Sequence, residues 1–252
     1  MDTASPFTPN VTTKEDWLAH RVALLEEEKA LLKAYDALVA KRRQMPWVKI
    51  DKLYVFDTPA GPKTLADLFE GRSQLLIQHF MYGPEWEEGC VGCSFGADHM
   101  EGVFTHLEHH DVKFTAISRA SLAQISAFKQ RMGWTFDWVS SAGSDFNYDF
   151  HVSFTEAEKA AGKVFYNFTQ SDYFCDELPG MSAFYKDEDG TVYHTYGVFA
   201  RGTELTSGVF QMLDIMAKGR NETGPNFNLT DWVRHHDKYE DTPALSACGC
   251  ST

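Results

Sequence analysis

The sequence has little positive charge and no long hydrophobic run. Its 252 residues carry 23 Lys and Arg against 36 Asp and Glu, so the formal net charge is −13 and the pI is near 5.1. Nucleic acids and anionic membrane surfaces attract basic proteins, and this balance argues against both as partners. No apolar stretch approaches the roughly 18 residues of a membrane span. The opening "MDTASPFTPN" resembles no secretory signal, so we expect a cytoplasmic protein.

Cysteine is also scarce. The five cysteines are spread over a long chain, at Cys90, Cys93, Cys175, Cys248 and Cys250. A secreted domain held together by disulfides would be shorter and denser in cysteine. In a reducing compartment, a close pair of cysteines is more typical of catalysis or metal binding than of a structural disulfide. Cys175, which stands alone, is expected to be a single core or surface thiol.

Apolar and aromatic residues, in contrast, are plentiful. Hydrophobic residues make up 43% of the chain and aromatic residues 14%, which supplies a substantial core and excludes a mainly disordered protein. We expect three parts. Residues 1–46 form a disordered lead and a long helix, residues 47–240 form the folded domain, and residues 241–252 form a flexible tail.

A long amphipathic helix is expected from about Thr13 to Gln44. Thr13 is a suitable N-cap, and Pro46 ends the helix. Two adjacent heptad series of apolar residues run along it, namely Trp17, Leu24, Leu31 and Leu38, and Leu18, Leu25, Leu32 and Val39. Such a stripe can be buried on its own domain or on a second copy of the chain, so a homodimer through this helix is one expectation.

Strand and helix patterns alternate after this helix. The stretches "SQLLIQHFMYG" and "VKFTAISRA" predict buried strands, and a helical segment follows each of them. "MSAFYKDEDGTVYHTYGVF" predicts a hairpin that turns at Asp189-Gly190. Strand, helix, strand, helix and hairpin together predict an α/β domain with a mixed sheet flanked by helices.

The pair Cys90–Cys93 follows the first of these strands and is expected to open the next helix. The free backbone N–H groups and the dipole of a helix N-terminus stabilise negative charge and lower a thiol pKa. Cys90 lies nearest that field and is therefore the expected nucleophile. Cys93 lies one turn later on the same face, where it can resolve a mixed disulfide. Glu87 and Glu88 oppose the lowered pKa through like charge.

Three other interpretations of the pair compete with a redox role. It could be half of a zinc or other soft-metal site, with Cys248 and Cys250 or histidines as the remaining ligands. It could also be two inert buried thiols or a permanent disulfide. The sequence contains no second C-x-x-C motif, so spacing and helix placement favour the redox interpretation. That interpretation requires no metal and no organic cofactor.

The histidines offer a weaker metal signal. His106, His109 and His110 are three and four residues apart on one predicted helix, a spacing that can present metal ligands. A solvated polar helix face is the more common meaning of this pattern. His235 and His236 are expected at the surface.

Four stretches together resemble a known family: "FMYGPEWEEGCVGCSF", "GSDFNYDF", "ELPGMSAFYKDEDG" and "TYGVFARG". They are similar to a widespread bacterial family of predicted dithiol–disulfide oxidoreductases with a thioredoxin-like fold and no settled physiological function. The resemblance extends from about Trp17 to Tyr239. It implies a thioredoxin-like mixed sheet with Cys90 and Cys93 at the start of the first long helix, and a layout like that of the peroxiredoxins.

The resemblance also implies where a substrate docks. Thioredoxins place a cis-proline opposite the cysteines, just before the strand that leads into the hairpin. Counting back from the hairpin turn puts this position near Ser182, and Pro179 is the nearest proline. Tyr82, Trp86 and Phe95 are expected to form an apolar rim beside the cysteines. The candidate substrate-docking residues are therefore Pro179, Ser182, Tyr82 and Trp86.

Four further residues are candidate auxiliaries. Arg119 follows a strand end, where open α/β sheets place their sites, and His99 falls on roughly the same side of its helix as the cysteine pair. Cys248 and Cys250 could exchange with the main pair if a flexible tail brings them to it.

The expected function is thiol–disulfide exchange. Cys90 attacks a disulfide or oxidised thiol on a protein or small molecule, Cys93 releases the product, and an external reductant restores the dithiol. A thiol peroxidase, in which Cys90 is oxidised to a sulfenic acid, is the alternative reaction. A soft-metal or metalloid binding protein that uses the same cysteines is the alternative from another class.

Overall fold

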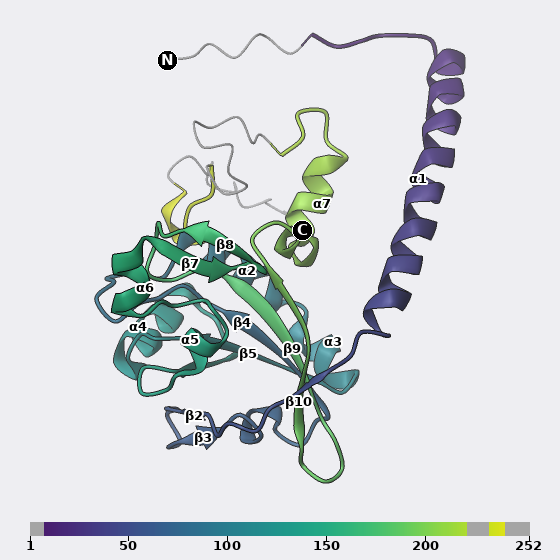
Figure 1. The fold of residues 1–252 in the computed structure, drawn as a ribbon. Helices are drawn as coiled ribbons and strands as arrows, with labels where there is room; N and C mark the ends of the chain where they lie inside the picture. Colours follow the sequence, from purple (N-terminus) through teal and green to yellow (C-terminus); the bar gives the residue numbers. More distant parts are fainter. Residues whose placement is uncertain (1–7, 221–231, 240–252) are drawn as a thin grey trace, which may run out of the picture. The chain divides into compact units, whose positions relative to one another are not determined.

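A computed structural model describes residues 8–220 and 232–239 of the protein (Figure 1). The chain divides after Pro46 into an N-terminal unit and a second unit that begins at Trp47. Within the described residues, no helix is both long enough and apolar enough to cross a membrane.

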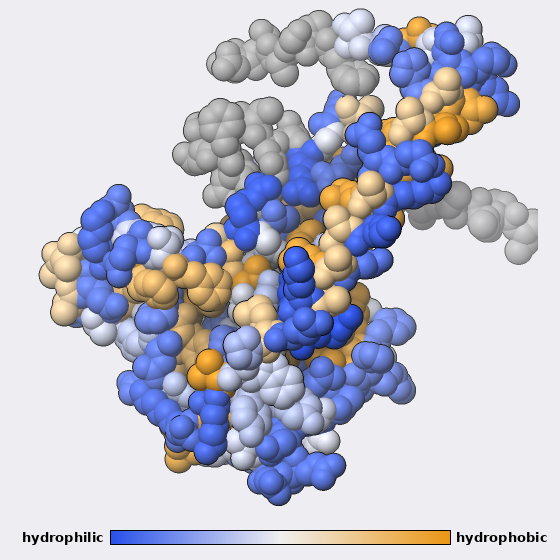
Figure 2. Space-filling model, turned by 45° about the vertical axis from the view of Figure 1, so that its right-hand side comes forward, coloured by the Kyte–Doolittle hydropathy of each residue, from blue (hydrophilic) through white to orange (hydrophobic). Residues whose placement is uncertain are grey.

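The N-terminal unit contains one long helix, α1 (Lys14–Arg42). The hydroxyl of Thr13 caps it by accepting the N–H of Asp16 at 3.1 Å, as the sequence predicts. No residue of the helix is buried. Figure 2 shows apolar residues of this helix in orange and tan on the visible surface. The large apolar side chains exposed along it are Trp17, Leu18, Val22, Leu24, Leu25, Leu31, Leu32, Tyr35 and Leu38.

The second unit is built on a six-stranded mixed sheet with the strand order β1-β10-β9-β4-β5-β6. Its strands are β1 (Val48–Lys49), β4 (Gln74–His79), β5 (Val112–Ser118), β6 (Asp137–Ser140), β9 (Gly180–Lys186) and β10 (Val192–Phe199). Strands β4, β5 and β6 are parallel, and β9 and β10 form an antiparallel hairpin beside β4. A parallel β-α-β unit next to an antiparallel hairpin is the thioredoxin arrangement, here extended by β6 and β1. The predicted fold class is confirmed.

Helices of modest length surround this sheet. They are α2 (Val91–Glu101), α3 (Phe104–His109), α4 (Leu122–Met132), α5 (Phe146–Asp149), α6 (Glu156–Ala161) and α7 (Gly208–Asp214). Three single turns of 3-10 helix are η1 (Asp67–Phe69), η2 (Thr203–Thr206) and η3 (His236–Lys238). Two small hairpins complete the unit: β2 (Val55–Phe56) with β3 (Lys63–Thr64), and β7 (Lys163–Tyr166) with β8 (Thr169–Asp172).

The two faces of the sheet carry separate cores. Side chains alternate along β4, so that Leu75 and Ile77 enter one cluster and Leu76 packs against the other. On the Leu76 face, α2 and α4 contribute Ala97, Met100, Ile125, Phe128 and Met132. On the other face, the buried phenylalanines are Phe56, Phe69, Phe146 and Phe184. The core on the Leu76 face therefore fixes α2, the helix that begins at the cysteine pair, against the sheet.

The expected homodimer through α1 stays a prediction, because one chain does not test it. Removing the stripe with Leu24→Glu and Leu31→Glu together should convert a dimer into a monomer, since charges cannot be buried in a helix–helix seam. Light scattering of the full chain gives the mass of each variant, and Glu27→Gln on the same helix is the matched control. A monomeric mass for the unchanged protein would contradict the prediction.

Candidate active site

The loop after β4 delivers the cysteine pair to the end of the sheet. It runs over residues 80–89, and Cys90 is the N-cap of α2. At Gly89 the chain passes so close to two rings that an added Cβ would lie 2.7 Å from Phe80 and 2.9 Å from Phe128. Only glycine fits there without displacing the core. The N–H of Cys90 also donates to the carbonyl of Met81 at 3.0 Å, which fixes where the helix begins.

The two thiols are coupled but differ in their surroundings. Both are reduced here; Cys93 is buried, whereas Cys90 is only partly covered. The Cys93 thiol donates a hydrogen bond to the Cys90 sulfur and lowers the pKa of Cys90 to about 7, against the effect of burial. The backbone N–H groups of Cys93 and Gly92, in the first turn of α2, lower it further. The reverse holds for Cys93, whose pKa the neighbouring Cys90 and burial raise well above the ordinary value.

These directions assign different roles to the two sulfurs. At neutral pH a large fraction of Cys90 is thiolate, and a thiolate is the nucleophilic form of cysteine. Cys93 stays protonated, and its sulfur accepts the N–H of Met81 at 3.4 Å. Glu87 and Glu88, which were expected to raise this pKa, are not among the groups that shift it; the Cys93 thiol and the first-turn amides lower the pKa of Cys90, and burial raises it.

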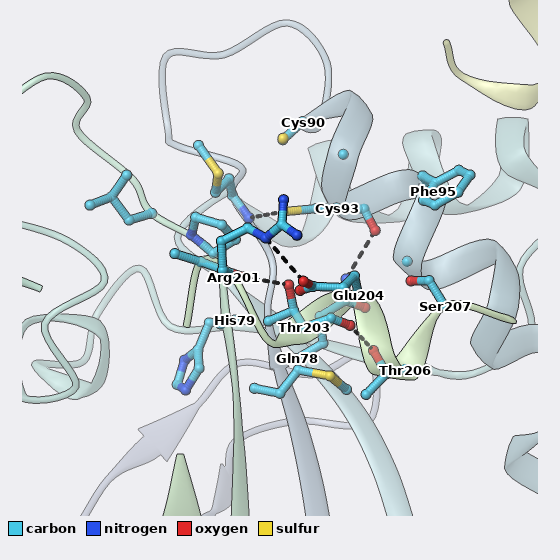
Figure 3. Close-up of a pocket in the computed structure, with 18 of the residues that line it drawn as sticks. Gln78, His79, Cys90, Cys93, Phe95, Arg201, Thr203, Glu204, Thr206 and Ser207 are labelled. Atoms are coloured by element: carbon cyan, nitrogen blue, oxygen red, sulfur yellow. Dashed lines mark hydrogen bonds and ion pairs between the residues drawn. The ribbon is translucent and has the colours of Figure 1, made fainter. Parts of the chain in front are cut away.

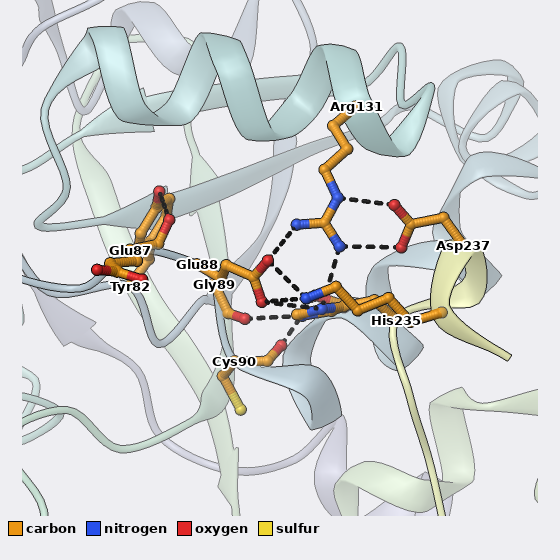
Figure 4. A network of polar contacts seen from close by, with 10 residues as sticks. Tyr82, Glu87, Glu88, Gly89, Cys90, Arg131, His235 and Asp237 are labelled. Carbon is orange, nitrogen blue, oxygen red and sulfur yellow. Dashed lines mark hydrogen bonds and ion pairs between the residues drawn. The ribbon is translucent and has the colours of Figure 1, made fainter. Parts of the chain in front are cut away.

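Glu88 is instead neutralised by cations from two other elements (Figure 4). Arg131 of α4 donates to it at 2.6 Å and Lys238 of η3 at 2.7 Å, and these contacts lower the pKa of Glu88. Arg131 also forms a two-point contact with Asp237 at 2.7 and 2.9 Å. The negative charge of Glu88, which lies next to the cysteines, is therefore neutralised in ion pairs that hold the loop in place.

His235 fastens the same loop from the C-terminal side (Figure 4). We expect it at the surface from the sequence, but the structure buries it. Its Nε2–H donates to the carbonyl of Gly89 at 2.9 Å, and its ring packs edge-on against Phe128. Residues 232–239 therefore close over the segment that leads into Cys90.

A cavity of about 560 Å³ opens beside the pair (Figure 3). Both cysteines line it, together with the end of β4, the first half of α2, the start of β9 and the segment between β10 and α7. Its walls are mostly apolar, and Met81, Phe95, Leu178, Met181 and Phe210 contribute to them. A volume of this size and a largely apolar lining are typical of small-molecule sites.

Pro179 lines this cavity and directly precedes β9, which is the position expected of the docking proline. The peptide bond that precedes Pro179 is trans, unlike the cis bond that the resemblance implies, and the described residues contain no cis peptide bond. Tyr166 of β7 holds it in place by donating its hydroxyl to the Pro179 carbonyl at 2.6 Å. The same hydroxyl accepts the N–H of Ala200 at 3.1 Å. It therefore links the segment before β9 that carries Pro179, called the docking loop below, to the end of β10.

Three of the predicted docking residues lie elsewhere. Ser182 is inside β9, fully buried, and its hydroxyl is hydrogen-bonded to His79 at 2.8 Å. Tyr82 is also buried and donates its hydroxyl to the carbonyl of Glu87 at 3.2 Å. Trp86 is partly buried against the core and does not line the cavity. The loop folds the side chains of Tyr82 and Trp86 away from the cavity, whereas Phe95, the third residue expected at the rim, does line it.

Of the candidate auxiliaries, Arg119 and His99 do not line the cavity, and both make contacts elsewhere. Arg119 pairs at 2.9 Å with Glu177, a buried carboxylate whose pKa burial raises. His99 links α2 to α7: its Nδ1–H donates to the Phe95 carbonyl at 2.7 Å, and its Nε2 accepts the N–H of Val209 at 3.1 Å.

The remaining candidates concern metal binding and the tail. Cys248 and Cys250 lie outside the described residues. Within residues 8–220 and 232–239, no group of three or more His, Cys, Asp and Glu side chains is placed to hold a metal ion. This finding covers His106, His109 and His110.

Two residues of the site are not singled out by the sequence. Gln78, a buried amide at the end of β4, donates to the carbonyl of Cys93 at 2.9 Å and lines the cavity. A glutamine directly after the apolar run Leu75–Ile77 was a signal that could have found it. Tyr166 gave no such signal, because it reaches the site from a hairpin that sequence patterns left unassigned.

Fold and site together define a thioredoxin-fold protein with a C-x-x-C dithiol at a helix N-terminus. The chain belongs to the family described as bacterial protein of unknown function (DUF899), whose model matches residues 6–239. No curated protein matches the sequence.

Three solved structures with a similar arrangement are distant in sequence. A PrxQ cysteine-to-serine mutant from Xylella fastidiosa is 15% identical, with a TM-score of 0.41 over 64% of this chain and 87% of that one. Thioredoxin peroxidase I from Plasmodium yoelii is 15% identical, with a TM-score of 0.40 over 79% and 94%. Peroxidoxin BcpB from Mycobacterium tuberculosis is 14% identical, with a TM-score of 0.34 over 58% and 80%. What the site does must be inferred from its own geometry.

The thiol environment predicts how alkylation depends on pH. Iodoacetamide should react with Cys90 at a rate that rises through about pH 7 and then levels off, because the thiolate form is already complete above its pKa. Peptide mass spectrometry identifies the modified residue. In Cys93→Ala, which removes the thiol donor, the midpoint should move up toward about 8.5. A wild-type midpoint already at that value would contradict the assignment.

Proposed function

We propose that the protein is a dithiol–disulfide oxidoreductase in which Cys90 is the nucleophile and Cys93 the resolving cysteine. The observation that carries this proposal is the opposite direction of the two pKa shifts. The outer thiol is stabilised as a thiolate and the inner one as a thiol, within one helical turn of each other. The cysteine that is stabilised as a thiolate is also the partly exposed one and lines the cavity, where a substrate can reach it.

The reaction uses both sulfurs in turn. The Cys90 thiolate attacks one sulfur of a substrate disulfide, the substrate S–S bond breaks, and the first product leaves as a thiolate. Cys93 then loses its proton and attacks the Cys90 sulfur of the mixed disulfide. The second product leaves, and the pair is oxidised to the Cys90–Cys93 disulfide. The substrate has gained two electrons, and an external dithiol must return two electrons to the protein.

Rigid support around the pair suits this exchange. The segment before Cys90 is held by two hydrogen bonds, from the Cys90 N–H to the Met81 carbonyl and from His235 to the Gly89 carbonyl. Close packing of Gly89 against aromatic rings of the core fixes it further. Each of these contacts is made through the backbone of the loop, so they fix the position of the sulfur without adding charge to it. A peroxidase would begin with the same thiolate, and no residue of the described site favours a peroxide over a disulfide.

A redox titration tests the proposal. We expect a reversible loss of two hydrogens from the Cys90–Cys93 peptides, with a two-electron midpoint between roughly −270 and −120 mV, the range of known oxidoreductases. Mass spectrometry of the intact and digested protein follows it. Cys90→Ser and Cys93→Ser should each abolish the transition, whereas the matched control Cys175→Ser should keep it. Failure to form the disulfide, or bound metal that blocks it, would refute the proposal, so metal content is assayed in parallel.

A further inference from the structure

We infer that the cavity beside Cys90 binds a small, uncharged organic disulfide that carries a hydrogen-bond donor, and that Gln78 selects this donor. The inference rests on the proposed function and adds to it a substrate class and a specificity-determining residue. A disulfide within a folded protein partner is the competing kind of substrate.

The shape of the site favours a small molecule. The cavity of about 560 Å³ falls within the range of roughly 300–1,000 Å³ found for small-molecule pockets. Cys90 is only partly exposed and shares the wall with apolar side chains of α2 and α7, including Phe95 and Phe210. A compact ligand with apolar arms can enter and place a sulfur against Cys90, whereas the surface of a folded partner would have to bulge into the cavity.

The charges around the cavity favour an uncharged ligand. Arg201 and Glu204, both in the lining, pair with each other at 3.0 Å and cancel (Figure 3). The chain as a whole carries a formal charge of −13. This net charge disfavours anionic disulfides, and Arg201 of the lining is already engaged by Glu204.

Gln78 is a buried polar side chain in this lining that has a hydrogen-bonding atom to spare. Its Nε2 donates to the Cys93 carbonyl at 2.9 Å, which orients the amide, and its Oε1 is buried with no hydrogen-bond partner among the described residues (Figure 3). The side chain is 7% exposed and lines the cavity. A buried acceptor without a partner is costly, and a hydroxyl or N–H donor on a ligand would satisfy it.

The chemistry of the bound disulfide balances. Cys90 forms an S–S bond to one substrate sulfur while the substrate S–S bond breaks and the other half leaves as a thiol. Cys93 then closes the protein disulfide and releases the second thiol. One disulfide molecule and the protein dithiol become two thiols and the protein disulfide, with two electrons passed from protein to substrate.

The test compares two disulfides of nearly equal shape. Bis(2-hydroxyethyl) disulfide has two hydroxyl donors, and dipropyl disulfide has methyl groups in their place. Rates of Cys90–Cys93 disulfide formation in the reduced full-length protein are measured by acid quench and mass spectrometry. Each rate is divided by the rate of the same disulfide with dithiothreitol, which removes intrinsic reactivity. We expect the normalised preference for the hydroxyl compound to be at least about tenfold.

Variants separate recognition from structure. In Gln78→Leu, the preference should fall to the value seen with dithiothreitol, whereas a merely structural role would slow both disulfides and leave their ratio unchanged. Gln130→Leu, the same change at an exposed position of α4, should keep the wild-type ratio. If Gln78→Leu does not fold, the normalised preference of the wild-type protein for the hydroxyl compound still tests the inference. The charged analogue 3,3′-dithiodipropionate should react more slowly than both neutral compounds after the same normalisation.

The outcomes distinguish a failure of this inference from a failure of the proposed function. A protein disulfide that forms in the wild type with no preference between the two compounds would leave the proposed function standing and overturn this inference, since Gln78 would then select nothing. Faster reaction with insulin, a protein disulfide, than with either small compound would overturn it as well. If the reduced protein forms no Cys90–Cys93 disulfide with any oxidant, the proposed function fails and this inference fails with it.

Discussion

The hydrogen bond from the Cys93 thiol to the Cys90 sulfur is the interaction on which the site depends. It stabilises a thiolate at Cys90, the partly exposed cysteine, and a proton at Cys93, the buried one. The bond requires the two residues to be one helical turn apart at the start of α2, and the first-turn amides then add to it. Much of the surrounding structure serves to place that turn. Gly89 lets the loop pass between two rings, and Met81 ties both cysteines to the end of β4.

Segments distant in the sequence complete the site around that turn. Residues 232–239 brace the loop from one side through His235 and the ion pairs of Glu88. On the other side, Tyr166 joins the docking loop to the end of β10. The cavity lies between these braces, so its shape depends on contacts that span most of the second unit. A rigid thiolate beside a largely apolar cavity is a combination suited to a small substrate.

Sequence patterns predicted the parts of this arrangement that depend on local order. The α/β alternation, the hairpin, the capped N-terminal helix and the placement of Cys90 at a helix start all follow from periodicity and capping residues. Ser182, Tyr82 and Trp86 were expected at the substrate, but the structure turns them away. Turn counting cannot locate a strand start to within three residues, and a ten-residue loop can fold its aromatic side chains inward. Tyr166 and His235 come from segments without a periodic signal, so only tertiary packing reveals them.

Trapping the mixed disulfide tests the central claim most directly, because it asks which sulfur attacks. The account predicts that Cys93→Ser, incubated with a disulfide, accumulates a covalent adduct on Cys90, since the serine hydroxyl can still donate to the thiolate but cannot resolve the product. It predicts little adduct on Cys93 in Cys90→Ser, where the remaining thiol is buried and protonated. Mass spectrometry of the digested proteins locates the adduct. Accumulation on Cys93, with Cys90 unmodified, would contradict the account.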